Sequence, residues 1–474
     1  MSAPMPVGTP HREASGLDRT LRLISDVHPG EGTSALLLAL NVFLLLTAYY
    51  VIKPLREALL LSTNSAETKS YLAAGQAILL LVLVPAYGLL ADRLPRRRLI
   101  TAVTGFFVLC LVAFYGLTRA AVPVGIPFFL WAGIFNMMIV AQFWGFANDL
   151  YTREQGERLF PIIAFGASLG AVTGSAVTGR LIPLLGISEL LLVAAGILIL
   201  ALLLGNLVDA RERARCEAGL PARFTTAEIP AATGEYLVQG KADAEKLTVS
   251  MSGAKGRPGT FRLVFAERYL LLIALLVLVV NWVNSTGEYV LSHTVARAAA
   301  DAVAAGTADG LSASQYIGRF YANFFFGVNA TALLLQLCVV SRLLRHFGVR
   351  TAILVMPLIA VIGYALLAFL PILAVVRWVK TAENATDYSL QNTVRNVLFL
   401  PTTREQKYKA KQAIDSFFVR SGDVLSALTI YVGTTMLTFG PNQFAMVNLA
   451  LAGIWVVLAL WIGRAYMRKT GASA

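Results

Sequence analysis

Apolar residues recur along the chain in long blocks that are separated by short charged segments. A block of roughly twenty residues is long enough to cross the hydrocarbon core of a bilayer as a helix. Because the blocks are continuously apolar rather than alternating, they favour helices over the strands of a barrel. The pattern therefore predicts an all-α polytopic membrane protein with about twelve transmembrane helices. We place these spans at 33–61, 70–91, 99–118, 122–148, 160–184, 187–209, 265–291, 316–341, 350–370, 371–400, 411–437 and 441–465.

Two stretches interrupt the apolar pattern. Residues 210–262 are rich in Arg and contain Pro and Gly, but they have no apolar stripe long enough for a core, so we interpret them as a cytoplasmic linker. Residues 292–315, with several alanines and two glycines, predict one sizeable outer loop, with or without a short surface helix. The chain then divides into an N-terminal six-helix half (1–209), the linker (210–262) and a C-terminal six-helix half (263–474).

A short repeated motif relates the two halves. Thr152-Arg-Glu-Gln155 follows the fourth span, and Thr403-Arg-Glu-Gln406 follows the tenth. Four letters alone can match by chance, but these two stretches also occupy equivalent positions within their halves. The repeat therefore favours two pseudo-symmetric six-helix halves.

The positions of the charged residues predict how the chain crosses the membrane. The chain is 57% hydrophobic and only 14% charged, and its formal net charge is +13. A basic balance can indicate a nucleic-acid partner, but most of the Lys and Arg residues fall in the connections on one side of the predicted membrane. The opposite side has few, namely Lys69, Arg119, Arg180, Arg297 and Arg319. By the positive-inside rule both termini lie in the cytoplasm, and we expect a bacterial inner membrane and no nucleic-acid partner.

Catalytic and metal chemistry finds no support in the sequence. The three cysteines lie far apart, and the four histidines are scattered. No Gly-rich phosphate loop ending in Gly-Lys-Ser or Gly-Lys-Thr is present, nor is a metal-ligating pair of histidines. We therefore expect no enzyme activity, no metal and no cofactor.

The connection between the second and third spans, 88–98, has the sequence Gly-Leu-Leu-Ala-Asp-Arg-Leu-Pro-Arg-Arg-Arg. It resembles the loop of the major facilitator superfamily of the form GxLaDrxGrk, with Pro95 in place of the usual Gly. The resemblance implies a major-facilitator-like fold in which Asp92, Arg93 and Arg96 pair across the cytoplasmic face and gate the path. The alternative is a short basic turn that merely obeys the positive-inside rule. A similar basic segment at the equivalent place in the second half favours the gating loop.

Charged residues also fall inside the predicted spans. The cations are Lys53, Arg56, Arg377, Lys380, Arg395 and Arg420, and the acids are Glu57, Glu288, Glu383, Asp387, Asp415 and Asp423. An ionised side chain near the bilayer centre costs roughly 2.5–3.5 kcal/mol even on the most lenient scale, so such residues usually face a cavity or a pathway. Interhelical ion pairs and snorkelling explain any single residue equally well. The whole set of cations favours a path for an anionic small molecule.

Four separated motifs carry a closer resemblance. They are Tyr50–Glu57, Phe143–Asn148, Tyr388–Leu390 and Lys409–Asp415. Together they resemble the nucleotide transporter (ATP/ADP translocase) family of plastids and intracellular bacteria, over about residues 35–440. The resemblance implies secondary transport by alternating access, with exchange of anionic nucleotides such as ATP and ADP.

The resemblance also implies individual site residues. The first-span cation of the family falls on Arg56, the seventh-span acid on Glu288, and the cation before the Ala-Ile-Asp stretch on Lys411. The fourth-span acid of the family would fall near Ala132, where this chain has no carboxylate. The residues that we expect to bind the substrate are Lys53, Arg56, Glu288, Asp387, Tyr388, Arg395 and Lys411.

Aromatic and small residues have simpler interpretations beside the functional ones. An adenine ring would stack on Tyr49, Tyr50, Trp144 or Tyr388, but packing or interfacial anchoring accounts for these rings equally well. The small-residue face of the fifth span predicts tight helix packing, and its members are Gly166, Ser168, Gly170, Gly174, Ser175 and Gly179.

Two other functions stay open on the sequence alone. One is a proton-coupled carrier of another organic anion, with Glu288 or Asp387 as the proton acceptor. The other is a non-transporting membrane scaffold or sensor, in which the buried charges are structural and the central linker holds a partner site. The lipid bilayer is a partner in every case, and the sequence does not indicate an oligomeric state.

Overall fold

A computed structural model describes residues 26–28, 31–93, 96–217, 260–403 and 406–470. Within these residues the chain is helical throughout and contains no strand. The N-terminal part forms α2 (Gly32–Leu61), α3 (Ala66–Arg93), α4 (Arg96–Arg119), α5 (Gly125–Leu150), α6 (Arg153–Leu185) and α7 (Ile187–Glu217). The C-terminal part forms α9 (Thr260–Ala266), α10 (Arg268–Ala304), α11 (Ala313–Leu335), η1 (Gln336–Val340), α12 (Ser341–Phe369), α13 (Leu373–Thr386), η2 (Asp387–Gln391), α14 (Asn392–Val397), η3 (Gln406–Ala410), α15 (Lys411–Ala413), η4 (Ile414–Phe418), α16 (Val419–Tyr431), η5 (Val432–Met436) and α17 (Pro441–Thr470), where η denotes a π-helical turn.

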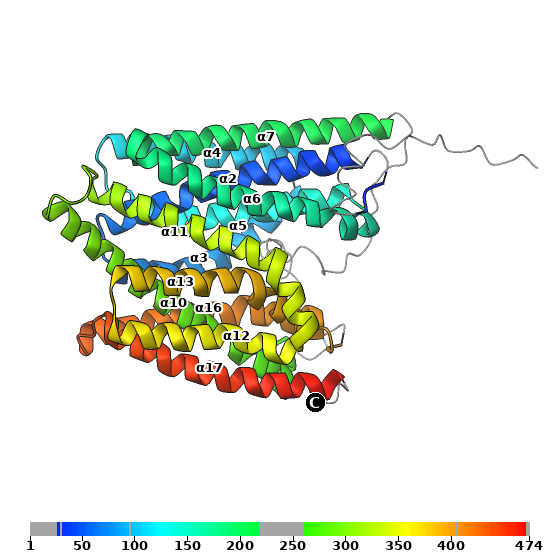
Figure 1. Ribbon diagram of the computed structural model, residues 1–474. Helices are drawn as coiled ribbons and strands as arrows, with labels where there is room; N and C mark the ends of the chain where they lie inside the picture. Colours follow the sequence, from blue (N-terminus) through cyan, green and yellow to red (C-terminus); the bar gives the residue numbers. More distant parts are fainter. Residues whose placement is uncertain (1–25, 29–30, 94–95, 218–259, 404–405, 471–474) are drawn as a thin grey trace, which may run out of the picture.

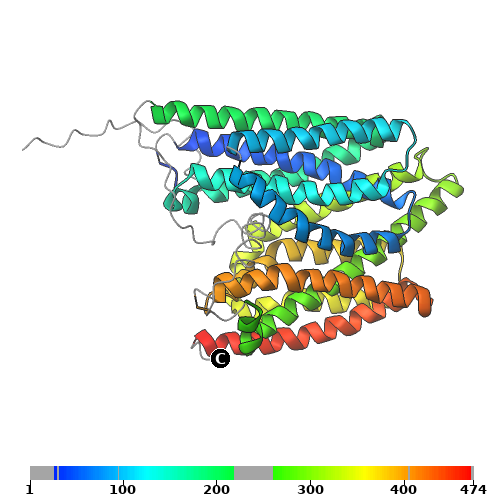
Figure 2. The same ribbon diagram turned by 180° about the vertical axis from the view of Figure 1, so that it is seen from behind.

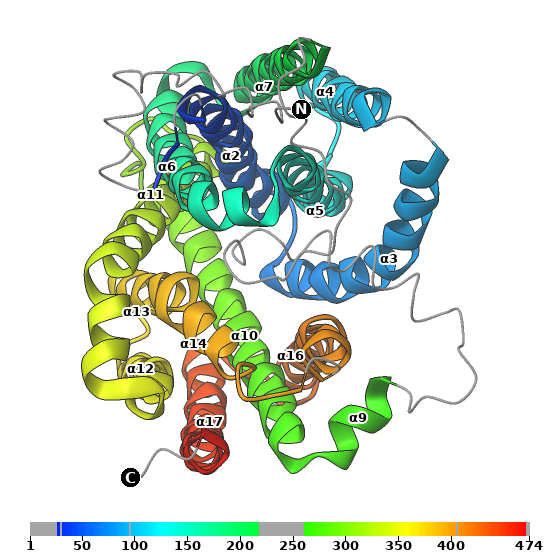
Figure 3. The same cartoon turned by 90° about the vertical axis from the view of Figure 1, so that its right-hand side faces the viewer.

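The helices of the two halves gather into two bundles that lie side by side. Figure 1 shows α2 and α4–α7 in one bundle and α10, α12, α13, α16 and α17 in the other, and Figure 3 shows the same division along the helix axes. Helices α3 and α11 lie where the bundles meet, because α11 packs on α6 and α2 while α3 packs on α16 and α10. The predicted fold class, a polytopic helical protein with two six-helix halves, is confirmed.

The two ends of the molecule can be told apart by the chain segments that lie there. The C-terminus and the start of α2 lie at the same end, as the view from behind also shows (Figure 2). We call this the proximal end. The opposite end, where α2 leads into α3 and α10 leads into α11, is the distal end.

Most predicted spans match helices within a few residues, and the described residues include eight helices that are apolar and long enough to cross a membrane. Three details differ from the expected pattern. Helix α10 continues without a break to Ala304, so most of the stretch 292–315 is helix rather than loop, and only residues 305–312 form the turn. The predicted tenth span is divided by the π-helical turn η2. Helix α7 extends to Glu217, into the predicted linker, of which residues 218–259 lie outside the described residues.

The repeated Thr-Arg-Glu-Gln motif makes the same contacts in both halves. Thr152 begins α6 with a capping box in which the side chains of Thr152 and Gln155 each bind the other's backbone. The Gln155 amide then donates to Glu31, immediately before α2, at 3.1 Å. In the second half, Thr403 and Gln406 form the same reciprocal hydrogen bonds. The Gln406 amide donates to Glu267, immediately before α10. The motif therefore joins the fourth connection of each half to the start of that half's first helix.

A glycine seam brings α6 onto α2. A Cβ atom at Gly166, Gly170 or Gly174 would lie 2.4–2.6 Å from a backbone carbonyl oxygen of α2, so only glycine permits this approach. The Thr47 hydroxyl on α2 lies 3.3 Å from the Gly170 carbonyl and donates to it across the seam. The prediction that these glycines serve tight helix packing is confirmed.

Pro54 interrupts the hydrogen bonding of α2 beside the functional residues described below. As proline has no N–H, the carbonyl of Tyr50, one turn earlier, receives no hydrogen bond from it. The hydroxyl of Thr178 on α6 reaches this carbonyl at 3.5 Å. The seam therefore supports α2 where its own ladder is broken.

Replacing Gly170 with Ala should destabilise the N-terminal half. Its Cβ would meet the Phe43 carbonyl oxygen at 2.4 Å, so the helices must separate, and overpacking of this kind costs about 1–3 kcal/mol. The matched control is Gly196→Ala on α7, where a Cβ atom would meet nothing within 4 Å. We expect thermal unfolding in detergent at a lower temperature for the first variant only. Equal unfolding temperatures for the two variants would contradict the seam.

Candidate functional site

Lys53 lies in α2 with aromatic rings of both halves around its ammonium group. Its Nζ lies 4.1 Å from the ring centroid of Phe325 on α11 and 3.5 Å from the Tyr388 hydroxyl on η2. The rings of Tyr49 and Tyr50, on α2 itself, lie within 6 Å of it. Among the described residues Lys53 forms no ion pair, so its charge is balanced by ring faces and a hydroxyl and not by a carboxylate. Such a cation can accept an anionic ligand without first giving up a salt bridge.

Arg56, one turn further along α2, belongs to a charged group centred on Glu57. The Glu57 carboxylate is almost fully buried; it accepts a hydrogen bond from the Arg56 guanidinium at 2.5 Å and forms an ion pair with the Lys69 ammonium at 2.7 Å. The guanidinium also lies over the ring of Phe129 on α5, at 4.8 Å from its centroid. Two cations on one carboxylate leave the group with a net positive charge, which also suits an anion.

Lys69 corrects an expectation. By its position it was assigned to the outer connection between the first two spans, yet it is in the first turn of α3 and only 9% exposed. Its ammonium contacts Glu57 of the same half and the Ser292 hydroxyl of the other half, at 2.8 Å from the latter. A cation in the first turn of a helix opposes the helix dipole, which indicates that Lys69 has a role other than stabilising α3.

Glu288 faces a second charged group, which α13 contributes. Lys380 is fully buried, and its ammonium lies 2.8 Å from Glu383 and 3.7 Å from Glu288. The side-chain amide of Asn284, one turn before Glu288 on α10, accepts from Lys380 at 3.0 Å. Glu288 also accepts from Asn384 at 3.1 Å. The predicted seventh-span acid is thus held on one side by a cation and an amide of α13.

The π-helical turn η2 carries Asp387 and Tyr388. A π turn widens a helix locally and is frequent at functional sites, because it redirects the side chains of a few residues. Tyr388 points across to Lys53, whereas Asp387 is half-buried and forms no ion pair among the described residues. The structure therefore places Tyr388, but not Asp387, in direct contact with Lys53.

The remaining predicted cations lie away from this centre. Arg395 on α14 faces Asp415 on η4 at 3.8 Å, and Lys411, at the start of α15, lies 5.8 Å from the ring centroid of Phe399. Both belong to the part of the C-terminal half where α14 leads into η3, at the proximal end. Arg377 is exposed, and Arg420 pairs with Asp423 on its own helix at 3.4 Å. The predicted set is thus divided between a central and a proximal group.

The loop residues Asp92, Arg93 and Arg96 are located only through their backbone. The first two end α3 and the third begins α4, while their side chains lie outside the described residues. Their pairing across the proximal end stays a prediction.

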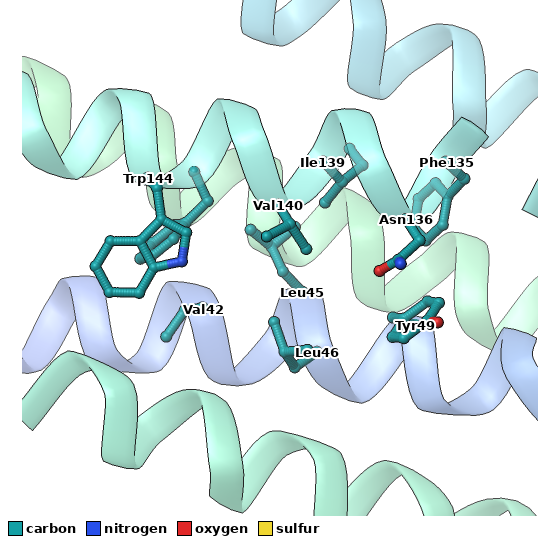
Figure 4. A pocket seen from close by; sticks show the side chains of 10 residues that line it. Val42, Leu45, Leu46, Tyr49, Phe135, Asn136, Ile139, Val140 and Trp144 are labelled. Carbon is teal, nitrogen blue, oxygen red and sulfur yellow. The ribbon is translucent and has the colours of Figure 1, made fainter. Parts of the chain in front are cut away.

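A small apolar cavity of about 10 Å³, room for about one water molecule, lies between α2 and α5 (Figure 4). The Tyr49 ring lines it and also belongs to the surroundings of Lys53, so the cavity adjoins the cationic centre. Asn136 supplies an amide at the same end as Tyr49, and Trp144 lies toward the other end, as Figure 4 shows. Tyr49, Tyr50 and Tyr388 thus lie near the cation, whereas Trp144 packs against Phe143 and Phe160.

Several contributors to the centre were not singled out from the sequence. Phe325, Asn284 and Ser292 lie on α11 and α10 among apolar or small residues, and nothing in their local pattern marks them. They become visible only when the helices are packed. Among the described residues no group of His, Cys, Asp and Glu is arranged to hold a metal ion.

Comparison with known proteins shows which family has this architecture. The sequence model of one family, described as the Major Facilitator Superfamily, matches residues 38–382. The chain belongs to the Major Facilitator Superfamily. The solved structure of the nucleoside transporter NupG, another protein with this fold, has a TM-score of 0.57 at 13% identity and covers 93% of this chain and 100% of its own.

Two curated relatives of this Major Facilitator Superfamily protein are more specific. It is 25% identical over 386 residues to ADP,ATP carrier protein 2 of Chlamydia trachomatis serovar D, which covers 72% of this chain and 65% of the relative. It is 23% identical over 378 residues to ADP,ATP carrier protein 1 of Chlamydia pneumoniae, with shares of 72% and 66%. The chain thus spans slightly under two thirds of the length of these relatives. They confirm the resemblance that the motifs indicated, and both relatives are carriers rather than enzymes.

Replacing Lys380 with Met should strongly destabilise the C-terminal half. The change leaves the Glu383 carboxylate buried without its cation, and breaking a buried pair in this way costs about 3–5 kcal/mol. The control is Arg377→Met, one turn earlier on α13, whose exposed side chain should matter by less than about 0.5 kcal/mol. The measurement is the fraction of monodisperse protein left after heating. Glu383→Gln added to Lys380→Met should restore part of the loss, and a fully stable Lys380→Met protein would disprove the pairing.

Proposed function

We propose that this protein is a secondary transporter that exchanges anionic nucleotides of the ATP and ADP type across the membrane by alternating access. The observation that carries the proposal is Lys53, a central cation without a carboxylate partner among the described residues, which lies among aromatic rings of both halves. A nucleotide combines these two demands, because its phosphates need cations and its base needs flat apolar walls.

The binding chemistry follows from the two parts of the site. The Lys53 ammonium and the Arg56 guanidinium lie one turn apart on α2, and Arg can offer planar, bidentate hydrogen bonds to phosphate oxygens. The cavity between α2 and α5 is too small for a base, so the base would bind beside Lys53, where Tyr49 offers a ring and Asn136 offers an amide that can donate to and accept from a base edge. The names of the two Chlamydia relatives support this class of substrate.

The location of Lys53 between the halves supports alternating access. Its contacts come from α2 of one half and from α11 and η2 of the other, so an anion bound there would be enclosed by both. Major facilitator transporters move their halves about such a midplane site. Glu288, Arg395 and Lys411 then contribute at the wall of the central site and along its proximal part.

We also propose that the proximal end faces the cytoplasm of a bacterium, with the protein in the inner membrane. The asymmetry of Lys and Arg along the sequence supports this orientation. The linker 210–262 would then be cytoplasmic.

A second candidate is a proton-coupled carrier of another organic anion. The half-buried Asp387, which has no ion pair among the described residues, favours it because such a carboxylate can take up a proton during transport. In that case uptake would require a pH gradient and would not require a counter-substrate.

The deciding measurement is uptake of labelled ATP into liposomes that contain the purified protein and either ADP or no nucleotide. Exchange predicts uptake only with internal ADP. Uptake should fall by about tenfold or more in Lys53→Gln and Arg56→Gln proteins, because each loses a charge-assisted contact to phosphate. Arg319→Gln is the control, since that side chain is half-exposed and its ion pair with Asp309 is a long one, at 3.9 Å.

Each result separates the candidates. Uptake driven by a pH gradient without internal ADP would favour the proton-coupled carrier. ATP uptake that is unchanged in both Lys53→Gln and Arg56→Gln would remove these residues from the site. No ATP uptake by folded, inserted protein would leave a transporter of another solute.

A further inference from the structure

The first turn of α3 reaches across to the other half at the distal end. The Lys69 ammonium donates to the Ser292 hydroxyl on α10 at 2.8 Å, and Ser292 is fully buried. Two residues earlier on α3, the Glu67 carboxylate accepts from the Tyr289 hydroxyl on α10 at 2.7 Å. We call these four side chains, Glu67, Lys69, Tyr289 and Ser292, the distal latch.

The latch is embedded in packed surroundings. Ser292 also hydrogen-bonds to the fully buried Tyr321 on α11, at 3.0 Å, and the Lys69 ammonium lies 5.4 Å from the centroid of the same ring. Nearby, Gly318 on α11 lies against Ala58 of α2 and Ile182 of α6. In such surroundings water cannot replace a broken hydrogen bond, so each contact between the halves is stronger than it would be at an exposed surface.

Lys69 links the latch to the charged group around Glu57. Its other contact is Glu57, at 2.7 Å, which fixes the ammonium in place and balances its charge. Since a cation in the first turn of α3 opposes the helix dipole, Lys69 does not serve the stability of its own helix. The hydrogen bond from Lys69 to Ser292 joins α3 to α10, two helices that must separate for the distal end to open.

We propose that Lys69 is a positioning residue for transport, which holds the distal ends of the two halves together through Ser292 and is itself held by Glu57. This role does not depend on the identity of the transported solute. The same Glu57 carboxylate also binds Arg56, so the closure of the distal end and the anion site share one group. Removing the Lys69–Ser292 bond shifts the protein toward states in which the distal end is open.

A disulfide cross-link can report closure at a separate place on the distal side of the interface. A Cβ atom at Gly179 on α6 would lie 2.8 Å from the Asn323 side chain on α11. The pair Gly179→Cys and Asn323→Cys, in the full chain with Cys110, Cys216 and Cys338 replaced by Ser, should therefore form a disulfide under mild oxidation when the halves are together. The rate of cross-linking in proteoliposomes then measures the fraction of time that the two halves are in contact at this place.

Lys69→Met should lower this rate by about tenfold, as expected for the loss of a charge-assisted hydrogen bond between the halves. Ser292→Ala, which changes no charge, should lower it by about threefold. The matched control is Arg297→Met, further along α10, whose exposed side chain pairs only with Asp301 on the same helix. Its cross-linking rate should be unchanged.

Ser292→Ala keeps the test valid if Lys69→Met, which removes one of the two cations of the buried Glu57 carboxylate, fails to fold. A cross-linking rate in Ser292→Ala equal to that of the parent pair would overturn the proposal, and so would a reduction of equal size in Arg297→Met. Neither result depends on nucleotide transport, so failure here is distinguishable from failure of the proposed function.

Discussion

A charged side chain in the interior of a membrane protein must find its partner within the protein, and this constraint organises the centre of the molecule. Glu57 is held by Arg56 and Lys69, and Lys380 is held by Glu383 and Asn284. Both groups join different helices, so the same interactions that neutralise the charges also fix the helix arrangement. Lys53 is the exception in the described part of the centre, because ring faces surround it in place of a carboxylate. The difference separates charges that hold the structure from one that is available to a ligand.

Packing decides which parts move together. The glycine seam brings α6 so close to α2 that the two helices form one unit, and Thr178 supports α2 where Pro54 breaks its hydrogen bonding. The contacts of α11 and α3 with the opposite half rely instead on side chains, such as Lys69 on Ser292. A backbone seam changes only when helices separate completely, whereas side-chain contacts can be made and broken. The structure therefore combines rigid halves with an interface that can be rearranged.

The sequence predicted the helices well, because a run of apolar residues determines a membrane span without reference to its neighbours. It also predicted the glycine face of α6 and the presence of Lys53 and Arg56 in the interior. It did not predict that Lys69 is buried, since a single cation beside a short connection has the pattern of a loop residue. It placed Tyr388 in the same binding set as Lys53, but it did not single out Phe325, whose ring comes from a helix far away in sequence. The π turn at Asp387 has no recognisable pattern in the neighbouring residues.

The contacts of the two Thr-Arg-Glu-Gln stretches bear on how the chain arose. In each half a Gln amide binds the acid that precedes the first helix, Glu31 in one case and Glu267 in the other. The charged centre has no such symmetry, since α2 supplies cations where its counterpart α10 supplies Glu288. A duplicated ancestral half would leave this record, with the contacts that close each half preserved twice and the residues that meet the cargo free to diverge. The two copies could then specialise, one for the charge of the solute and the other for its surroundings.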